Sequence, residues 1–208
     1  IKIEDNKGLC SGTSLFYEYL VEHNYLDLDN KVIYEFVELT RKYDTWEWKT
    51  KYNEEMSHAL TLLFEAVGCD NYIRLMREKL EVQPTFSFNK LEMMLIENKK
   101  EQTNEKLLSY SKKIYEKEIK NLKAGIVFID YEYRNDFAEY MRGQKTDLDF
   151  VMLVAMDYGT ISYRSIKDGI NVREIAEYFG GKGHDKAASS PIKPEILEQI
   201  LDAIIGDK

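Results

Sequence analysis

A glycine-rich segment in the last part of the sequence has the residue types of an anion site. Residues 180–184 read Gly-Gly-Lys-Gly-His. Because glycine has no Cβ atom, the backbone N–H groups of such a segment can converge on a phosphate or carboxylate, and a histidine adds a further donor. Gly180 and Gly181 could equally serve to end a helix. The segment alone therefore leaves two interpretations open, a helix end or a binding loop.

Arg164 favours the binding interpretation. It lies at the end of an apolar, β-rich run, and strand ends close to glycine-rich loops commonly bind ligands. A guanidinium presents a planar fork that fits two phosphate oxygens. The alternative is an exposed arginine whose stem covers the sheet. Arg164 and the glycine-rich segment together predict an anion clamp.

These segments resemble a known family. Residues 162–165 (SYRS) and 170–189 (INVREIAEYFGGKGHDKAAS) are similar to the DHH-associated domain of the DHH phosphoesterase superfamily, with its Ser-x-Arg-Ser, short helix, Gly-Gly-Gly-His and Ala-Ala-Gly motifs. Lys182 and Ser189 depart from the pattern, since both stand where the family has glycine. The matching residues are Ser162, Arg164, Ser165, Gly180, Gly181, Gly183, His184, Ala187 and Ala188. The resemblance implies that the substrate is bound by Arg164, Ser165, Gly180, Gly181, Lys182, Gly183 and His184.

The first half resembles the same family through two short segments. Residues 10–20 (CSGTSLFYEYL) look like the helix start that follows the Asp-His-His motif. Residues 43–48 (YDTWEW) look like the segment with the last metal-binding aspartate in the branch of oligoribonucleases and cyclic-nucleotide phosphodiesterases. The resemblance implies that Asp44 is a ligand in a site of two Mn²⁺ ions. A helix-end or turn role for Asp44 is the alternative.

The family's main metal motif is absent from this sequence. No Asp-His-His occurs, and the histidines are His23, His58 and His184. His23 and His58 are expected to be surface or capping residues. Since Mn²⁺ prefers about six oxygen or nitrogen ligands, one carboxylate cannot retain it. We therefore assign no catalytic residue to this chain, expect it to bind rather than cleave by itself, and expect further residues upstream of Ile1.

Trp46 and Trp48 could contact a ligand or pack internally. Their alternate spacing would place both rings on one side of an extended segment, where a nucleobase could stack. Core packing at a domain seam is the alternative, and it is the one we favour.

The apolar period of the first half predicts helices. They are expected at about residues 13–23, 31–43, 54–67 and 70–80, and Gly68 is expected to end the third. The polar stretch 89–122 predicts a long helix, interrupted near Thr103.

The pattern changes at Ala124. Short β-rich runs and helical segments then alternate in the order strand, helix, strand, strand, helix, loop, helix, and the second and third strands are expected to pair antiparallel. The strands are expected at 124–131, 149–159 and 160–166, and the helices at 135–142, 171–179 and 194–205.

This order defines the expected fold class, an α/β protein whose second half carries a mixed β-sheet. By resemblance, residues 1–88 are the helical C-terminal portion of a DHH domain, residues 89–123 a linker helix, and residues 124–208 the DHH-associated substrate-binding domain.

Composition limits the classes of protein and partner. With 44% hydrophobic residues and a formal charge of −8, the 208-residue chain has enough apolar residues for real cores and is a poor candidate for coating long nucleic acid. No run of about 18 apolar residues or signal-peptide pattern occurs, so we expect a cytoplasmic protein without membrane contact. A homodimer is left open.

The resemblance implies a function for the complete protein. It would be a Mn²⁺-dependent phosphodiesterase or exonuclease-type hydrolase of short oligonucleotides or small nucleotides, with the present segment supplying the phosphate grip. Short RNA, short DNA, a cyclic dinucleotide, adenosine bisphosphate and polyphosphate all remain open as substrates. The alternative is a nucleotide-binding or regulatory module without catalysis.

Overall fold

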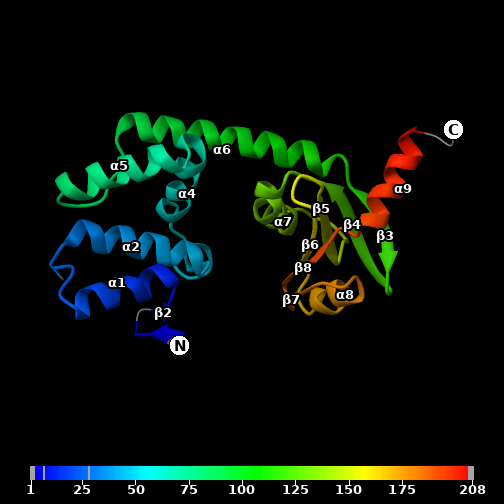
Figure 1. Ribbon diagram of the computed structural model, residues 1–208, viewed down its shortest axis with the longest axis horizontal. Helices are drawn as coiled ribbons and strands as arrows, with labels where there is room; N and C mark the ends of the chain where they lie inside the picture. The colour runs from blue at the N-terminus through cyan, green and yellow to red at the C-terminus, as the bar shows by residue number, and fades with distance from the viewer. Residues whose placement is uncertain (1–2, 7, 28, 206–208) are drawn as a thin grey trace. The chain divides into compact units, whose positions relative to one another are not determined.

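A computed structural model describes residues 3–6, 8–27 and 29–205 (Figure 1). The chain divides into two compact units, Ile1–Gln102 (unit 1) and Thr103–Lys208 (unit 2). The boundary falls inside helix α6 (Lys90–Ser111), within the segment expected to be a linker. The roles given above to the three predicted domains stay predictions.

Unit 1 is helical, as the apolar period predicts. Its core includes Leu60, Leu63 and Met76, which are buried among residues of α2, α4, α5 and α6. The elements of unit 1 are β1 (Glu4–Asp5), β2 (Gly8–Leu9), α1 (Gly12–Glu22), α2 (Lys31–Asp44), α3 (Glu47–Thr50), α4 (Met56–Val67), α5 (Cys69–Val82) and the first part of α6.

Side-chain and glycine caps fix the ends of these helices. Ser11 begins α1 with a capping box, in which its Oγ accepts from Ser14 N at 3.2 Å and Ser14 Oγ accepts from Ser11 N at 2.9 Å. Gly68 ends α4 with φ of +77°, and its N–H donates to the carbonyl of Phe64. The position of Gly68 confirms its predicted role as a helix end.

Trp46 and Trp48 belong to an aromatic cluster rather than to an extended segment. Trp46 has φ of +63° and precedes α3, so the chain turns between the two rings. Their centroids are 5.7 Å apart, and Trp48 stacks on Tyr43 at 6.4 Å and on His58 at 5.1 Å. The two rings are partly buried and pack within unit 1, whereas their predicted place at a domain seam stays a prediction. The expectation for His58 is wrong, because its ring is half-buried in this cluster, where desolvation lowers its pKa.

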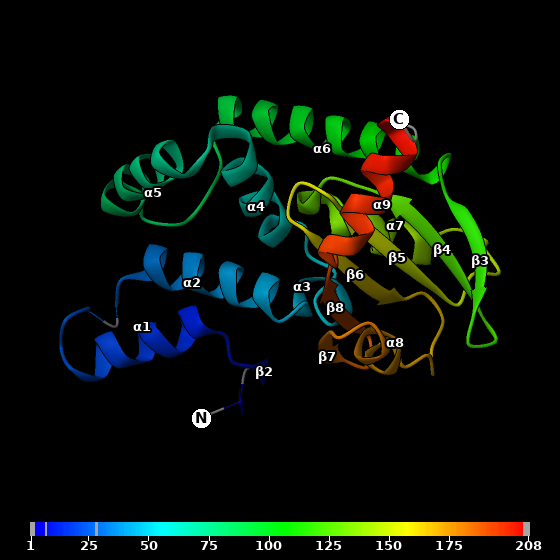
Figure 2. The ribbon, with the colours of Figure 1, turned by 45° about the vertical axis from the view of Figure 1, so that its right-hand side comes forward.

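Unit 2 is built on a mixed β-sheet, which confirms the predicted fold class (Figure 2). In the described residues the strand order is β3-β4-β5-β6-β8-β7; the pair β4–β5 is parallel and the other pairs are antiparallel. The elements after α6 are β3 (Tyr115–Ile119), β4 (Leu122–Phe128), the 3₁₀ helix η1 (Tyr131–Tyr133), α7 (Arg134–Arg142), β5 (Phe150–Ala155), β6 (Thr160–Ser165), α8 (Val172–Tyr178), β7 (Lys182–His184), β8 (Ala187–Pro191) and α9 (Pro194–Ile205).

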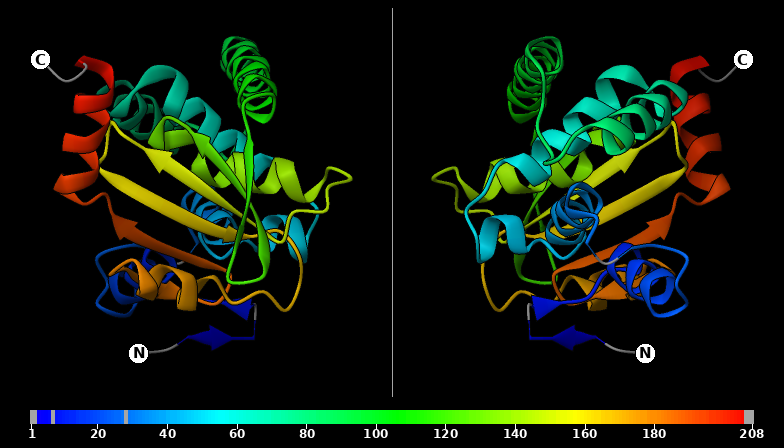
Figure 3. Two further views of the ribbon diagram at one scale, coloured as in Figure 1. Left: turned by 90° about the vertical axis from the view of Figure 1, so that its right-hand side faces the viewer. Right: turned by 90° about the vertical axis from the view of Figure 1, so that its left-hand side faces the viewer.

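Helices cover both faces of this sheet. Alternate residues of β5 point to opposite faces, so Val151 and Leu153 pack with Phe137 of α7, while Phe150 and Met152 pack with Ile175 of α8. The strands can be followed in Figure 3. We call these two faces the α7 face and the α8 face.

Two segments differ from the predicted elements. Helix α6 is continuous through the buried Thr103 but ends at Ser111, and residues 115–119 form strand β3 instead of more helix, paired in a hairpin with β4, which overlaps the strand predicted at 124–131. Lys120 and Asn121 both have positive φ, as the tight turn of a hairpin requires. β3 is an edge strand with four of five residues exposed, so its alternating charges face water and obscure the strand pattern. The expected loop after α8 is the hairpin β7–β8.

In the residues described, no helix is long and apolar enough to cross a membrane. The cytoplasmic location and the homodimer stay predictions.

Candidate substrate-binding face

The strand register of unit 2 brings the two principal predicted residues together. Arg164 of β6 lies opposite Ala187 of β8, and Ala187 lies opposite His184 of β7. Directly opposed residues of an antiparallel pair point to the same face of a sheet. Arg164 and His184 therefore share one face, with only the methyl group of Ala187 between them.

Lys182 lies on the same face, two residues from His184 along β7. It is opposite Ser189, which is in turn opposite Ser162. The face is the α7 face, because Arg164 Nη2 donates to Asn135 Oδ1 at 3.1 Å from the first turn of α7. One face thus carries Arg164, Lys182 and His184.

Ser165 lies elsewhere. Alternation along β6 places it on the α8 face with Tyr163, and it is 4% exposed. Its carbonyl oxygen accepts from Arg142 Nε at 3.1 Å. The structure does not bring the Ser165 hydroxyl to Arg164, so its predicted substrate contact stays a prediction with no support from geometry.

The glycines act mainly through close packing rather than as an open anion nest. The N–H groups of Gly180 and Gly181 donate to the carbonyls of Glu177 and Ala176 at 3.0 and 2.8 Å, so both end α8. A Cβ atom on Gly183 would lie 2.3 Å from the Cα atom of Ala188. The expected convergence of free N–H groups is wrong for Gly180 and Gly181, because the helix end already uses those donors.

Gly181→Ala is expected to destabilise unit 2 by about 1–3 kcal/mol. The new Cβ atom would lie 2.1 Å from the carbonyl oxygen of Ser189, a backbone atom that can move only with β8. Chemical denaturation followed by far-UV circular dichroism measures the loss. Gly143→Ala is the control, because the nearest atom to its Cβ is 3.4 Å away and its φ is −75°. Equal stability of the two variants would refute the packing role of Gly181.

Arg164 has a half-buried charge without a carboxylate partner in the described part of the chain. Its Nη1 donates to the carbonyl oxygens of Tyr163 and Ala188 at 3.0 and 3.3 Å. Desolvation, followed by the charges of Arg134 and Arg142, lowers the pKa of Arg164 to about 10. The side chain is still cationic at neutral pH. An anion bound here would offset both the desolvation and the repulsion.

Sequence reasoning missed the residues that α7 adds to this face. Arg134 and Arg142 begin and end α7, and Asn135 bonds Arg164. Arg142 is paired with Glu139 at 2.9 Å, whereas Arg134 has no ion pair among the described residues. The available signal was the arginine at each end of a short helix before a buried strand.

Lys182 and His184 are exposed side chains. Neither has an ion pair within residues 3–6, 8–27 and 29–205. Both are therefore open to an anionic ligand that approaches Arg164 from solvent.

Asp44, the predicted metal ligand, is the last residue of α2 and is exposed, and desolvation raises the pKa of its carboxyl group. Within the described ranges, no group of three or more His, Cys, Asp or Glu side chains could hold a metal ion. The described residues therefore do not form a complete Mn²⁺ site. His23 caps α1 through a 2.9 Å contact between its Nδ1 and the carbonyl oxygen of Tyr19, as expected.

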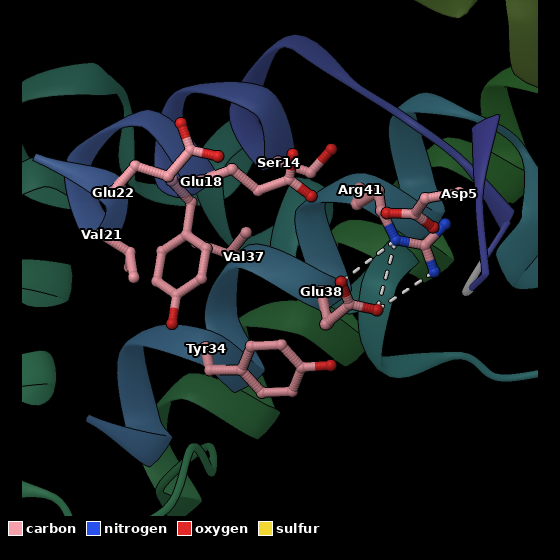
Figure 4. A pocket seen from close by; sticks show the side chains of 10 residues that line it. Asp5, Ser14, Glu18, Val21, Glu22, Tyr34, Val37, Glu38 and Arg41 are labelled. Carbon is pink, nitrogen blue, oxygen red and sulfur yellow. Dashed lines mark hydrogen bonds and ion pairs between the residues drawn. The ribbon is translucent and has the colours of Figure 1, made fainter. Parts of the chain in front are cut away.

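Unit 1 contains a small pocket, but its charges do not suit an anion (Figure 4). Acidic side chains border it, among them Glu18, Glu22 and Glu38. Its guanidinium, Arg41, is held by Glu38 and Glu47. The α7 face of unit 2 is therefore the better candidate for binding a phosphate.

No family model matches the chain. Among curated proteins, the oligoribonuclease NrnB of Bacillus subtilis is 30% identical over 199 residues, which cover 95% of this chain and 49% of that protein. The chain thus spans about half the length of this relative.

Solved structures give weaker likenesses. An uncharacterized protein from Helicobacter pylori G27 has a TM-score of 0.37 and 19% identity over 89% of this chain and 64% of that one. A pGpG-specific phosphodiesterase, PggH from Vibrio cholerae, has a TM-score of 0.40 and 14% identity over 64% of this chain and 49% of that one. The DHH domain of a member of the S1p family of ribosomal proteins has a TM-score of 0.40 and 16% identity, over 93% of this chain and 46% of that one.

These TM-scores, all below 0.5, do not establish a shared overall arrangement. The identity to NrnB extends over nearly the whole chain, and the motif residues from Ser162 to Ala188 lie in β6, at the end of α8, in β7 and in β8. The chain is thus similar over nearly its whole length to a curated oligoribonuclease, in agreement with the resemblance of its motif residues to the DHH phosphoesterase superfamily.

Proposed function

We propose that this chain binds the phosphate-bearing end of a short oligonucleotide or small nucleotide, and that the complete protein hydrolyses a phosphodiester bond in that substrate. The observation that carries the proposal is the register that places Arg164 and His184 on one face, across Ala187. The name of the 30% identical relative, an oligoribonuclease, supports the same substrate class.

The roles follow from the chemistry of each side chain. Arg164 offers a guanidinium fork to two phosphate oxygens, and its own carbonyl contacts hold the fork in place. Lys182 adds a point charge, and His184 a ring donor at the edge of the same face. Gly183 allows β7 to lie close enough to β8 for this arrangement.

In this proposal, two Mn²⁺ ions belong to the complete protein and supply the activated water for hydrolysis. Within this chain only Asp44 is offered as a ligand. Asp44 is the last residue of α2, and its carboxylate would supply one residue of the larger ligand set that such a site needs. The chain's own residues bind and orient the substrate.

Titration of a 5′-phosphorylated diribonucleotide into the 208-residue chain tests the proposed phosphate grip, that is, binding by Arg164, Lys182 and His184. Arg164→Ala is expected to weaken binding by about 10- to 100-fold, because a hydrogen bond to a charged group contributes about 1.5–3 kcal/mol. Arg164→Lys keeps the charge but loses the fork, so it should recover only part of the affinity. His184→Ala should cost less, since its side chain is exposed. Isothermal titration calorimetry at two salt concentrations measures each affinity.

Arg173→Ala is the matched control. Arg173 is a half-exposed arginine of α8 in the same unit, paired with Glu177 at 3.3 Å. The substitution removes one positive charge without touching the α7 face. The affinity of this variant for the diribonucleotide should therefore stay within about twofold of that of the unaltered chain. Equal affinities for the chain, Arg164→Ala and His184→Ala would overturn the proposed grip.

A nucleotide-binding module without catalysis is the second candidate. It is favoured, for this chain taken alone, by the lack of a complete metal-ligand group among the described residues. Hydrolysis of the same diribonucleotide by the chain with added Mn²⁺ separates the two candidates. Cleavage that depends on Mn²⁺ would contradict our expectation that this chain is inactive by itself.

A further inference from the structure

A stack of three planar groups stands at one end of the sheet in unit 2, and the substrate grip does not use it. The rings of Tyr131 and Tyr158 are nearly parallel, with centroids 4.0 Å apart and an interplanar angle of 13°. The guanidinium carbon of Arg134 lies 3.7 Å from the centroid of Tyr131. Because two groups this close cannot share one face of a ring, Tyr131 lies between Arg134 and Tyr158.

The stack is held in place by backbone and side-chain contacts. Tyr131 follows β4, and Tyr158 lies in the turn between β5 and β6. The N–H of Tyr131 donates to Asp157 Oδ2 at 3.2 Å, which ties the two segments together. Arg134 Nη1 donates to the carbonyl oxygen of Tyr131 at 2.9 Å. The orientation of the tyrosine rings is therefore set before any ligand binds.

Tyr158 presents one ring face to solvent. The residue is 64% exposed although Tyr131 covers its inner face. In the described part of the chain, Tyr131 is the one ring that packs on it. A fixed, open aromatic face next to water is apolar surface that a planar ligand can cover at low cost in conformational entropy.

The charges beside the stack select the kind of planar ligand. Arg134 has no ion pair among the described residues, and its neighbour Asn135 bonds Arg164 Nη2 at 3.1 Å. The positively charged side chains of the α7 face thus extend from Arg164 to Arg134, which packs on the ring of Tyr131. A flat, apolar group carrying a negative charge fits this combination, and a nucleotide has both parts.

We propose that the outer ring face of Tyr158 stacks a nucleobase of the bound oligonucleotide, while Arg164 and Arg134 face its phosphates. The inference rests on the proposed function, to which it adds a base-binding site that tolerates any of the four bases, since every base has a π-face. Selectivity for nucleotides over inorganic phosphate or polyphosphate follows, because neither has a ring to stack.

The test uses a 5′-phosphorylated diribonucleotide and the same ligand with abasic riboses. Tyr158→Ala is expected to weaken binding of the diribonucleotide by about 10-fold or more, and Tyr158→Trp to keep or strengthen it. Binding of the abasic ligand should be weaker and should not respond to either substitution. A 2-aminopurine base in the diribonucleotide should lose fluorescence on binding to the chain and lose less on binding to Tyr158→Ala.

Tyr115→Ala is the matched control. Tyr115 is 67% exposed on β3, the opposite edge strand of the same sheet from β7, so its loss should leave affinity unchanged. Wild-type affinity in Tyr158→Ala, with weakened binding in Arg164→Ala, would refute the stacking site and leave the phosphate grip standing. Wild-type affinity in both variants would overturn the grip as well. An equal loss for the normal and abasic ligands would also refute stacking.

Discussion

Arg41→Met is expected to lower the free energy of unfolding of unit 1 by about 3–5 kcal/mol. The side chain of Arg41 is 2% exposed, and its guanidinium contacts Glu38, Glu47 and the carbonyl oxygen of Leu9. Methionine can fill much of the space but leaves Glu38 and Glu47 without their buried cation. The large loss comes from the carboxylates that lose this cation, although Glu47 keeps its ion pair with Lys51, and not from a cavity.

Fluorescence of the two tryptophans measures this loss in unit 1, because Trp46 and Trp48 both lie in that unit. Urea unfolding of the variant and of Lys42→Met gives the comparison. Lys42 is the neighbouring cation, 3.8 Å from Glu54 with both side chains partly exposed, so its loss should cost under about 1 kcal/mol. Similar losses for the two variants would contradict the proposed role of the buried Arg41.

The ion pairs of Glu47 with Arg41 and Lys51 also determine the direction in which the stability of unit 1 changes with pH. Burial alone would raise the pKa of Glu47, but hydrogen bonds from Arg41 and Lys51 outweigh it and hold the pKa below its ordinary value. A carboxyl group with a lowered pKa in the folded state stabilises the fold above its unfolded pKa of about 4.3. That contribution is lost as the pH falls through the folded pKa.

Breaking the Lys79–Glu92 pair is expected to cost about 3–5 kcal/mol as well. Lys79 Nζ lies 2.8 Å from Glu92 Oε2, and both side chains are 5% exposed. Lys79 also donates to the carbonyl oxygen of Ser87 at 2.7 Å, while Glu92 accepts from Asn89 N at 2.8 Å. Glu92→Gln keeps the shape of the side chain but leaves a buried ammonium group beside a neutral amide.

A double-mutant cycle measures the pair. Lys79→Met and Glu92→Gln together should cost less than the sum of the single losses, because the second change removes the stranded charge left by the first. Lys100→Met is the control, since Lys100 and Glu55 form an ion pair that is 41% and 81% exposed. Strict additivity in the cycle would refute the coupling.

The apolar period predicted much of the fold, because amphipathic helices and buried strands have patterns that depend on burial. Helices α2 and α4 and the strands β5 and β6 were predicted close to their observed positions. Edge strand β3 was missed because it buries almost nothing, and a polar segment with helix-forming residues then looks like helix. Hairpin β7–β8 was missed because glycine-rich strands resemble loops.

The candidate site could be predicted only in part. Arg164 and His184 were found through their motif, and the register now supplies the reason why they lie together. Arg134 and Tyr131 could not be connected with them from sequence, since that connection depends on how the start of α7 packs beside β6. The metal role of Asp44 needs ligands that the described residues do not supply.

The alternation in Gly181-Lys182-Gly183-His184 has a consequence for the fidelity of strand pairing. Added Cβ atoms at Gly181, just before β7, and at Gly183 within it would lie 2.1 and 2.3 Å from backbone atoms of β8, so these two positions have room only for hydrogen. A slip of β7 by one residue would drive Lys182 and His184 into those places, and the clash forbids it. Lys182, which departs from the family's glycine run, thus excludes the shifted pairing of β7 with β8, because only one register of the hairpin has room for its side chain.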